Sequence, residues 1–495
     1  MISNTTRLLV RNVSHLGIGL VASTVIGILL AALVGRALEP TQFGILYIVF
    51  AINAFISVIV DWGQSTYLVR EMARGRIDEP ELIGSALLIR LSAIVLCTAA
   101  AVAIAPALGY NREFVGWMLL AVMAAVPNLL YVPIACSFRG KDRMDIDATA
   151  NIVGKAVALV ATAVALRFGG DLTEVIVMQG VGGFCTLVVG AIVALRLDIA
   201  VKAPTMKLFR ELLRYGAPIA VFSLVIASQP FVEIMMLSAF TSPVVVGWYG
   251  ASRTIFGVVI SPALIAGTAT FPELSRASLS LPDLRRMIDA TARVLFIAAA
   301  FTSSALYLFA DHMVAIIYGH GRFEQSASIL RVSAIFIPLL FVSVLLASAM
   351  SAVGRNKAMA IISVVRIAVF AILGWLFIGY SQQRFGNGGI AVALIAGLTE
   401  IPSMIACLIL LPRGAVGSTT ALNGVRACIA SLCTVVPLSM LQPLGLFSLA
   451  PLYALLFAAT AMVTRLVLPS DLRLVIEIAR SRVLAPRATK SAPDG

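Results

Sequence analysis

The chain has 495 residues, of which 60% are hydrophobic and only 12% are charged, and its net charge is +13. Soluble domains are about 45–50% apolar and about 25% charged, so this composition excludes an ordinary soluble protein. Basic loops on one side of a membrane explain the positive charge, which therefore does not indicate a nucleic-acid partner.

The sequence predicts about 14 membrane-spanning helices, because apolar runs of about 20 residues recur along almost the whole chain. Turn-forming stretches such as "EPTQFG" and "QQRFGNGG" separate the runs. We therefore predict an all-α polytopic membrane protein. In chain order the predicted spans lie near 13–35, 43–60, 84–108, 114–137, 148–166, 172–195, 215–240, 244–271, 289–317, 327–352, 358–380, 388–411, 422–441 and 446–467.

The distribution of basic residues assigns a side to each loop. Most of the 37 lysines and arginines fall in alternate loops, on the same side as both termini. Cytoplasmic loops carry the excess of Lys and Arg, so both termini are predicted to lie in the cytoplasm, in a cytoplasmic (inner) membrane protein. The tail "SDLRLVIEIARSRVL" combines a helical apolar stripe with basic residues, which predicts a helix on the inner membrane surface. The predicted outer loops hold Arg36, Arg112, Arg167, Arg322, Arg331 and Arg384.

A weak internal repeat relates the two halves of the chain. "EPTQFGILY" is echoed by "TSPVVVGWY", so that Gly44 matches Gly247, and "RGKDRM" is echoed by "VGRNKAM". Further along, Lys155 matches Arg366. Because six spans separate each pair, the halves share one orientation, which indicates a parallel repeat. We predict two pseudo-symmetric six-helix lobes at 1–196 and 215–412, a cytoplasmic linker at 197–214, two further helices at 413–467 and a basic cytoplasmic tail at 468–495.

Three stretches carry a resemblance to a known family: "GRALEPTQFGILY" (35–47), "DWGQSTYLVREMARG" (61–75) and "VEIMMLSAFTSPVVVGWYGASRTI" (232–255). They resemble the Wzx-type polysaccharide flippases of the multidrug/oligosaccharidyl-lipid/polysaccharide exporter superfamily. The resemblance implies two lobes around a central cavity and transfer of a lipid-linked oligosaccharide from the inner to the outer leaflet. The Asp that is common in the seventh span of that family is replaced here by Glu233.

Four cations fall inside predicted spans, where a charge is costly and usually faces a cavity or the bundle interior. They are Lys155, Arg253, Arg366 and Arg90. For Lys155, Arg366 and Arg90 the alternative is a side chain that reaches back to the headgroups. For Arg253, which shares a helix face with Gly250 and Gly257, the alternative is close helix packing. The functional hypothesis is that these cations bind the diphosphate of a polyprenyl-diphosphate-linked oligosaccharide.

Acidic and polar residues within the spans suggest coupling and cavity lining. Glu233 is a structural partner of Arg253 or a titratable gate, and Glu400 is either a site for H+ or Na+ coupling or a buried neutral acid. Asn53, Ser57 and Asp61 follow i, i+4, i+8 spacing, which predicts one polar face that lines the cavity. Asp61 is a third candidate for coupling or gating, and the alternative is that it ends its helix at the inner surface. Asn151 and Gln229 are further candidates for lining a cavity.

No catalytic or cofactor motif stands out. The phosphate loop GxxxxGK[ST] is absent, as is any ligand spacing for a metal, so we predict a transporter without cofactors rather than an enzyme. Membrane lipids and, by pathway, a polysaccharide polymerase and export machinery are the predicted partners. Two alternatives remain: a cation-coupled multidrug exporter of the same superfamily, and a polytopic polysaccharide polymerase or glycosyltransferase.

Overall fold

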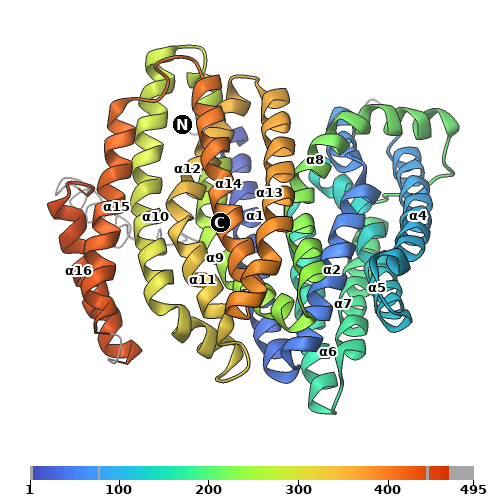
Figure 1. Cartoon of the computed structure of the whole chain (residues 1–495). Coiled ribbons are helices and arrows are strands. Elements are labelled where there is room, and N and C mark those ends of the chain that lie inside the picture. The colour runs from blue at the N-terminus through green and yellow to red at the C-terminus, as the bar shows by residue number, and fades with distance from the viewer. Residues whose placement is uncertain (1–3, 76–77, 442–444, 468–495) are drawn as a thin grey trace, which may run out of the picture. The chain divides into compact units, whose positions relative to one another are not determined.

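The computed structural model describes residues 4–75, 78–441 and 445–467, and within them every regular element is a helix (Figure 1). The predicted surface helix in the tail lies outside these residues. The helices are α1 Asn4–Ala37, α2 Pro40–Asp61, α3 Gln64–Arg74, α4 Glu79–Ile104, α5 Arg112–Gly140, α6 Met144–Arg167, α7 Leu172–Arg196, α8 Met206–Phe240, α9 Pro243–Ala277, α10 Leu281–Tyr318, α11 Gln325–Ile335, α12 Ile337–Ala352, α13 Asn356–Phe385, α14 Gly388–Leu410, α15 Ser418–Ser439 and α16 Leu446–Val463, with a 3-10 turn at Ala105–Leu108.

The predicted spans coincide with these helices. In the described part of the chain, 11 helices are long and apolar enough to cross a membrane, or 12 if α11 and α12, which are bent by 51° at Phe336, count as one span. Two shorter apolar helices, Val21–Ala37 and Ser448–Val463, coincide with the first and the last predicted spans. Such helices satisfy their backbone hydrogen bonds internally, as the hydrocarbon region requires. The all-α polytopic membrane fold is therefore confirmed.

The helices group into two compact units. The first holds residues 1–259, 311–332 and 357–399, and the second holds 260–310, 333–356 and 400–495. The lobe boundaries predicted from the repeat stay a prediction. The predicted linker 197–214 is non-helical only as far as Thr205, because α8 already begins at Met206.

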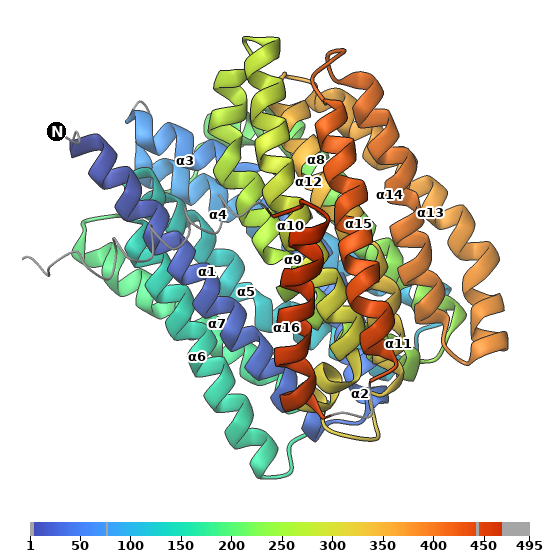
Figure 2. The same cartoon turned by 90° about the vertical axis from the view of Figure 1, so that its left-hand side faces the viewer.

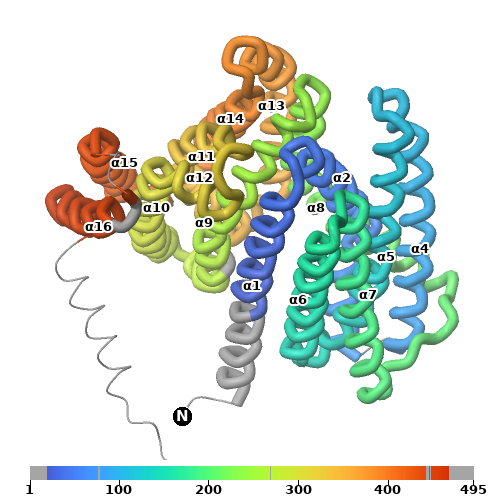
Figure 3. The backbone as a smooth tube through the Cα atoms, turned by 90° about the horizontal axis from the view of Figure 1, so that it is seen from below, coloured from blue at the N-terminus to red at the C-terminus, as the bar shows by residue number. Residues whose placement is uncertain are grey.

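In the first unit, small residues let α6 and α7 approach closely. A Cβ on Gly154 of α6 would lie 1.8 Å from Thr186 Oγ1, and one on Gly182 of α7 would lie 2.5 Å from the Ala158 Cβ. Small residues drive such contacts in membranes, where lipid gives no hydrophobic gain for burying larger side chains. The two helices run side by side in both Figure 2 and Figure 3, and α1 packs along α6.

The helix α3 was not predicted, since the sequence placed a loop between the second and third spans. Trp62 and Gly63 have φ values of 45° and 70°, and this left-handed pair ends α2 and starts the new helix. Gly63 fits because a Cβ there would lie 2.6 Å from the Gly216 carbonyl oxygen of α8. The apolar face of α3 then enters a buried cluster formed by Tyr67, Leu68, Leu82, Ala86, Ile89, Cys136, Leu208 and Leu212.

The N-terminal ends of α2 and α9 touch through the two glycines that the sequence repeat pairs. A Cβ on Gly44 would lie 1.8 Å from the Pro243 carbonyl oxygen, and one on Gly247 would lie 2.2 Å from the Pro40 carbonyl oxygen. Equivalent positions of the repeat therefore face each other, and each needs a residue without a side chain. We call this contact the glycine contact.

In the second unit, α15 and α16 pack together and are tied to α10 by hydroxyl groups. Thr434 and Thr460 share a hydrogen bond of 2.9 Å, and Tyr453 donates one of 2.6 Å to the Phe301 carbonyl oxygen. Asp289 of α10 accepts from Thr419 and Thr420 at the start of α15. These bonds place polar side chains against helix backbones, which satisfies them within the bundle.

Candidate functional site

A cavity of about 490 Å³ lies within the first unit, among α1, α2, α7, α8 and α9. This volume falls in the range of small-molecule sites, about 300–1,000 Å³. Its walls are mostly apolar, and five aromatic rings contribute to them. These are Phe43, Tyr47, Phe50, Phe55 and Phe231, of which Phe55 and Phe231 stack with ring centroids 4.3 Å apart.

Three polar side chains line this cavity: Tyr47, Gln179 and Thr254. The Nε2 atom of Gln179 is buried and has no hydrogen-bond partner among the described residues. A buried amide without a partner is costly, so a ligand that accepts a hydrogen bond there would be stabilised. Sequence reasoning missed Gln179, since one Gln in an apolar span has no periodic signal.

Glu233 of α8 forms the centre of a polar cluster beside the cavity. Its side chain is only 2% exposed, and Tyr249 donates a hydrogen bond of 2.7 Å to Oε2 while Gln229 donates one of 3.1 Å to Oε1. Its Oε2 atom also lies 3.7 Å from Nη2 of Arg253 on α9. The predicted proximity of Glu233 and Arg253 is thus confirmed, and Gln229 supports the acid rather than lining the cavity.

Arg253 is the partly accessible member of this cluster, with 32% of its side chain exposed. Its guanidinium lies 5.4 Å from the centre of the Phe256 ring, a cation–π distance. Tyr47 lies close enough to interact with both charges, and its ring packs on Gly250. The small residue at position 250 therefore serves close packing, as one of the two sequence interpretations held. Because Tyr47 and Thr254 also line the cavity, the cluster borders it directly.

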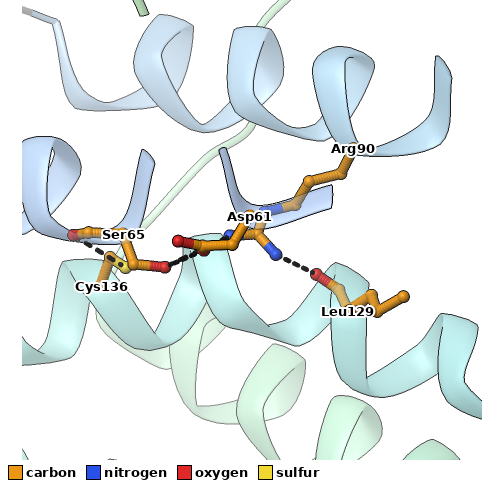
Figure 4. A network of polar contacts seen from close by, with 5 residues as sticks. All are labelled: Asp61, Ser65, Arg90, Leu129 and Cys136. Atoms are coloured by element: carbon orange, nitrogen blue, oxygen red, sulfur yellow. Dashed lines mark hydrogen bonds and ion pairs between the residues drawn. The ribbon is translucent and has the colours of Figure 1, made fainter. Parts of the chain in front are cut away.

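The structure places Arg90, predicted as a cavity cation, in a buried ion pair that is not part of the cavity lining. Arg90 is 1% exposed and forms an ion pair with Asp61, whose side chain is 31% exposed. Figure 4 shows the guanidinium between Asp61 and the Leu129 carbonyl oxygen, to which Nη1 donates at 3.3 Å. Ser65 donates to the same carboxylate and accepts from Arg90 at 3.3 Å. A buried ion pair with this many hydrogen bonds is a structural element at the end of α2.

Asn53 and Ser57, predicted to line a central cavity, are not among the residues that line this cavity. Asn53 donates to the Ala121 carbonyl oxygen of α5 at 3.3 Å, and Ser57 donates to the Asn53 carbonyl oxygen at 2.7 Å. The side of α2 that lines the cavity is the apolar one, with Phe50, Ala54 and Val58. The polar face instead points to α4 and α5, where it finds backbone and ionic partners.

The remaining candidates are not among the residues that line the cavity. Lys155 is exposed on α6 and forms no ion pair with a described residue, whereas Asn151, one turn earlier, donates to Asp147 at 2.9 Å. Thr162, expected on the same polar face, is buried. Arg366 of α13 is half-buried, and Glu400 of α14 is 4% exposed. Substrate binding by Lys155, Arg253 and Arg366 therefore stays a prediction, as does a coupling role for Glu400. Within the described chain no group of three or more His, Cys, Asp or Glu is arranged to hold a metal ion.

Comparisons with known proteins agree with this architecture. A family model described as "Polysaccharide biosynthesis protein" matches residues 9–278. No curated protein matches the chain in sequence. The lipid II flippase MurJ in an inward closed conformation superimposes with a TM-score of 0.74 at 12% identity, over 93% of this chain and 99% of that one.

Two further solved structures share the fold. An inward-facing multidrug resistance MATE family transporter of the MOP superfamily gives a TM-score of 0.63 at 15% identity, over 84% of this chain and 99% of that one. A MOP superfamily transporter from Pyrococcus furiosus gives 0.57 at 16% identity, over 82% and 96%. Because the family model matches more than half of its residues, the chain belongs to the polysaccharide biosynthesis protein family, and its fold is that of these flippase and MATE structures.

Proposed function

We propose that the protein is a flippase that moves a polyprenyl-diphosphate-linked oligosaccharide across the cytoplasmic membrane by alternating access, for synthesis of a cell-surface polysaccharide or exopolysaccharide. Membership of the polysaccharide biosynthesis family supports the pathway. The fold shared with a lipid II flippase supports a lipid-linked substrate. A polysaccharide polymerase and export machinery would then use the product on the outer side.

The observation that carries the proposal is an apolar cavity bordered by a partly exposed guanidinium. A lipid-linked diphosphate is amphiphilic: its isoprenoid chain needs an apolar environment, while its anion needs charged donors when it leaves water. The cavity offers the first, and Arg253 at its border offers the second. Arg suits this role because its planar fork binds phosphate oxygens in pairs.

Lys155 and Arg366 are the further candidates for holding the diphosphate. Lys155 has no competing carboxylate among the described residues, so its charge is available to a ligand. Arg90, by contrast, is already neutralised by Asp61. The cation set of the proposal is therefore Lys155, Arg253 and Arg366.

Glu233 is the residue that we propose for coupling to H+ or Na+. No ATP-binding motif is present in the sequence, so transport has to draw on an ion gradient, the membrane potential or downstream use of the product. Neutralising Glu233 would weaken its hold on Arg253, and the guanidinium would then be free to follow the anion. Transport and ionisation are linked in this scheme by one ion pair.

The experiment is a flux assay in proteoliposomes with a fluorescent polyprenyl-diphosphate sugar. Replacing both Lys155 and Arg366 with Gln should lower the initial rate about tenfold or more, since each charge-assisted bond lost is worth about 1.5–3 kcal/mol. The unfolding temperature should stay near that of the parent because Lys155 is exposed. A variant with Arg112→Gln and Arg384→Gln, which loses the same charge from exposed positions at the ends of α5 and α13, is the control. Full flux in the Lys155 and Arg366 variant would reject the assignment of these cations.

A multidrug exporter is the second candidate, because five aromatic rings and an acidic residue also suit a hydrophobic organic cation. Binding separates the two functions. The flippase proposal expects thermal stabilisation by the polyprenyl-diphosphate sugar and none by an organic cation such as a quaternary ammonium dye. Stabilisation by the dye alone would overturn the flippase assignment in favour of the exporter.

A further inference from the structure

The first three turns of α8 carry a basic stripe, which consists of Lys207, Arg210 and Arg214. Their i, i+3, i+7 spacing places all three on one face over roughly 10 Å of helix. All three side chains are exposed. On the opposite face, Leu208 and Leu212 are buried in the apolar cluster with α3 and α4. This segment is therefore an amphipathic helix whose apolar face is already used by the protein and whose free face is positive.

The basic stripe differs from its neighbours in having no acidic partners. Several nearby cations are paired, as Arg139 is with Asp147 at 2.8 Å, Lys141 with Glu79 at 2.9 Å and Lys202 with Asp78 at 2.6 Å. None of the three cations of the stripe forms an ion pair with a described residue. Glu211, the one acid within the segment, instead accepts a hydrogen bond of 2.9 Å from Tyr67. The charge of the stripe is therefore left for a ligand outside the described chain.

The helix α3 extends the positive surface. Tyr67 of α3 stacks on Tyr215 of α8 with ring centroids 5.6 Å apart, and the Arg70 guanidinium lies 5.1 Å from the Tyr67 ring centre. Arg70 and Arg74 share one carboxylate, that of Glu71. Five cations on the two helices thus face two carboxylates, and a positive excess remains along the whole surface.

Exposed apolar side chains lie among these cations. Met206 and Tyr215, at the two ends of the stripe, are 64% and 52% exposed. Cations interleaved with exposed apolar and aromatic side chains, directly before a membrane span, are typical of a segment at the membrane interface. We propose that the basic stripe binds the phosphate groups of anionic phospholipids in the inner leaflet.

Such a site gives the transporter a dependence on lipid composition that is separate from substrate binding. Lys and Arg clusters next to a membrane span bind anionic headgroups through the negative potential of the inner surface. Bound phosphates would hold α8 and α3 at a fixed depth, directly beside the α2 end, where Trp62 donates to the Leu213 carbonyl oxygen at 3.1 Å. The ligand is a structural lipid and is not transported.

The experiment measures the phosphatidylglycerol that remains on the full-length protein after purification from nanodiscs of phosphatidylcholine and phosphatidylglycerol. In native mass spectrometry, a variant with Lys207→Gln, Arg210→Gln and Arg214→Gln should retain fewer phosphatidylglycerol molecules than the parent. Its apparent affinity for added phosphatidylglycerol should fall at least about tenfold. The thermal stabilisation that this lipid gives to the parent should be lost as well.

The matched control removes three charges that are not clustered, by Arg112→Gln, Arg167→Gln and Arg384→Gln on three different helices. This control should keep the phosphatidylglycerol of the parent. Equal lipid retention by the stripe variant, or an equal loss in the control, would overturn the proposal. So would a stripe variant that keeps its phosphatidylglycerol but loses polyprenyl diphosphate, since the stripe would then be a loading site for substrate. None of these readouts requires transport, so they stand apart from the proposed function.

Discussion

At the scale of single residues, the open question about the polar cluster beside the cavity is the role of Glu233. This acid is either a titratable gate or a structural partner of Arg253. The acid is buried and holds Gln229, Tyr249 and Arg253 from two helices. Glu233→Gln keeps the size of the side chain but removes its charge. We expect a loss of about 1–3 kcal/mol in the free energy of unfolding, because Arg253 loses its counter-ion. If Glu233 is the gate, the variant's flux should also become independent of pH.

Two measurements check this prediction: thermal unfolding in detergent, and flux in proteoliposomes as a function of pH. Tyr249→Phe is the control, since it removes one hydrogen bond and leaves the ion pair in place; its cost should be about 0.5–1.5 kcal/mol. The gate would be contradicted if the flux of the parent did not change with pH and Glu233→Gln had the same flux as the parent. Glu233 would then have a structural role only.

The ion pair between Asp61 and Arg90 is a second residue-scale test, this time of stability alone. Removing one partner leaves a charge in a buried place, so Asp61→Asn and Arg90→Met should each destabilise the protein by about 3 kcal/mol. The double variant should cost clearly less than both single changes added together, because no charge is then left unpaired. Unfolding temperatures of the four proteins give the coupling.

Arg70→Gln is the reference for that cycle. Arg70 also pairs with an acid, Glu71, but half of its side chain is exposed. Exposed ion pairs contribute about 0–1 kcal/mol, so Arg70→Gln should change the free energy of unfolding very little. Simple additivity in the cycle of Asp61 and Arg90 would show that the pair does not stabilise the end of α2.

At the scale of elements, the glycine contact between α2 and α9 sets how closely these helices approach. Gly44→Val would place side-chain atoms where the Pro243 carbonyl oxygen now lies, so the two helix ends must separate. We expect lower flux and greater access to the neighbouring cavity. A cysteine introduced by Ala54→Cys, in the cavity wall, should react faster with an impermeant thiol reagent when Gly44→Val is also present.

A glycine on α9, the other helix of the glycine contact, supplies the control for this prediction. Gly257 of α9 has no atom within 4 Å of where a Cβ would lie, so Gly257→Ala should change neither flux nor labelling. The six native cysteines make the single variant Ala54→Cys the necessary baseline. Unchanged labelling in Gly44→Val would mean that the glycine contact does not close the cavity.

The helix α3, which was not predicted, shows what local sequence patterns cannot predict. Its 11 residues are too short and too polar for a span, and "DWG" before it reads as the start of a loop. Two tertiary contacts fix the position of this helix: the close approach of Gly63 to the Gly216 carbonyl oxygen, and the burial of Tyr67 in the apolar cluster. The first contact comes from α8, about 150 residues further along the chain, and the cluster combines residues of α4, α5 and α8, so no nearby sequence pattern predicts either contact.

At the scale of the whole molecule, the charge pattern makes a prediction about orientation. Loops rich in Lys and Arg should lie in the cytoplasm together with both termini. Cysteines introduced by Arg112→Cys and Arg384→Cys should react with an impermeant reagent added to intact cells, whereas Lys207→Cys and Lys357→Cys should react only after the cells are opened. All four positions are exposed, so access depends on the side of the membrane alone. Labelling of Lys207→Cys in intact cells would reverse the orientation.

Hydropathy along the chain predicted approximately where each apolar helix lies, although α8 begins at Met206 and α10 at Leu281, eight or nine residues before the predicted spans. Hydropathy averaged over about 20 residues is a local quantity, and lipid forces each such run into a helix. The repeat matched Gly44 with Gly247 in sequence, and the structure shows in addition that these two positions are in contact. The proximity of Glu233 and Arg253 followed from their places on consecutive helices.

Which charges are paired, and which face of each helix lines the cavity, became known from the packed helices and not from the sequence. A helix that is apolar all round gives no sign of how it is rotated about its axis. Asn53 and Ser57 therefore looked suited to a cavity, although the apolar side of α2 forms its wall. Arg90 looked available until Asp61, contributed by another helix, neutralised it. The partners of a side chain lie on helices that are distant in sequence. Packing between these helices fixes how each one is rotated about its axis, so neither property can be predicted from a single span.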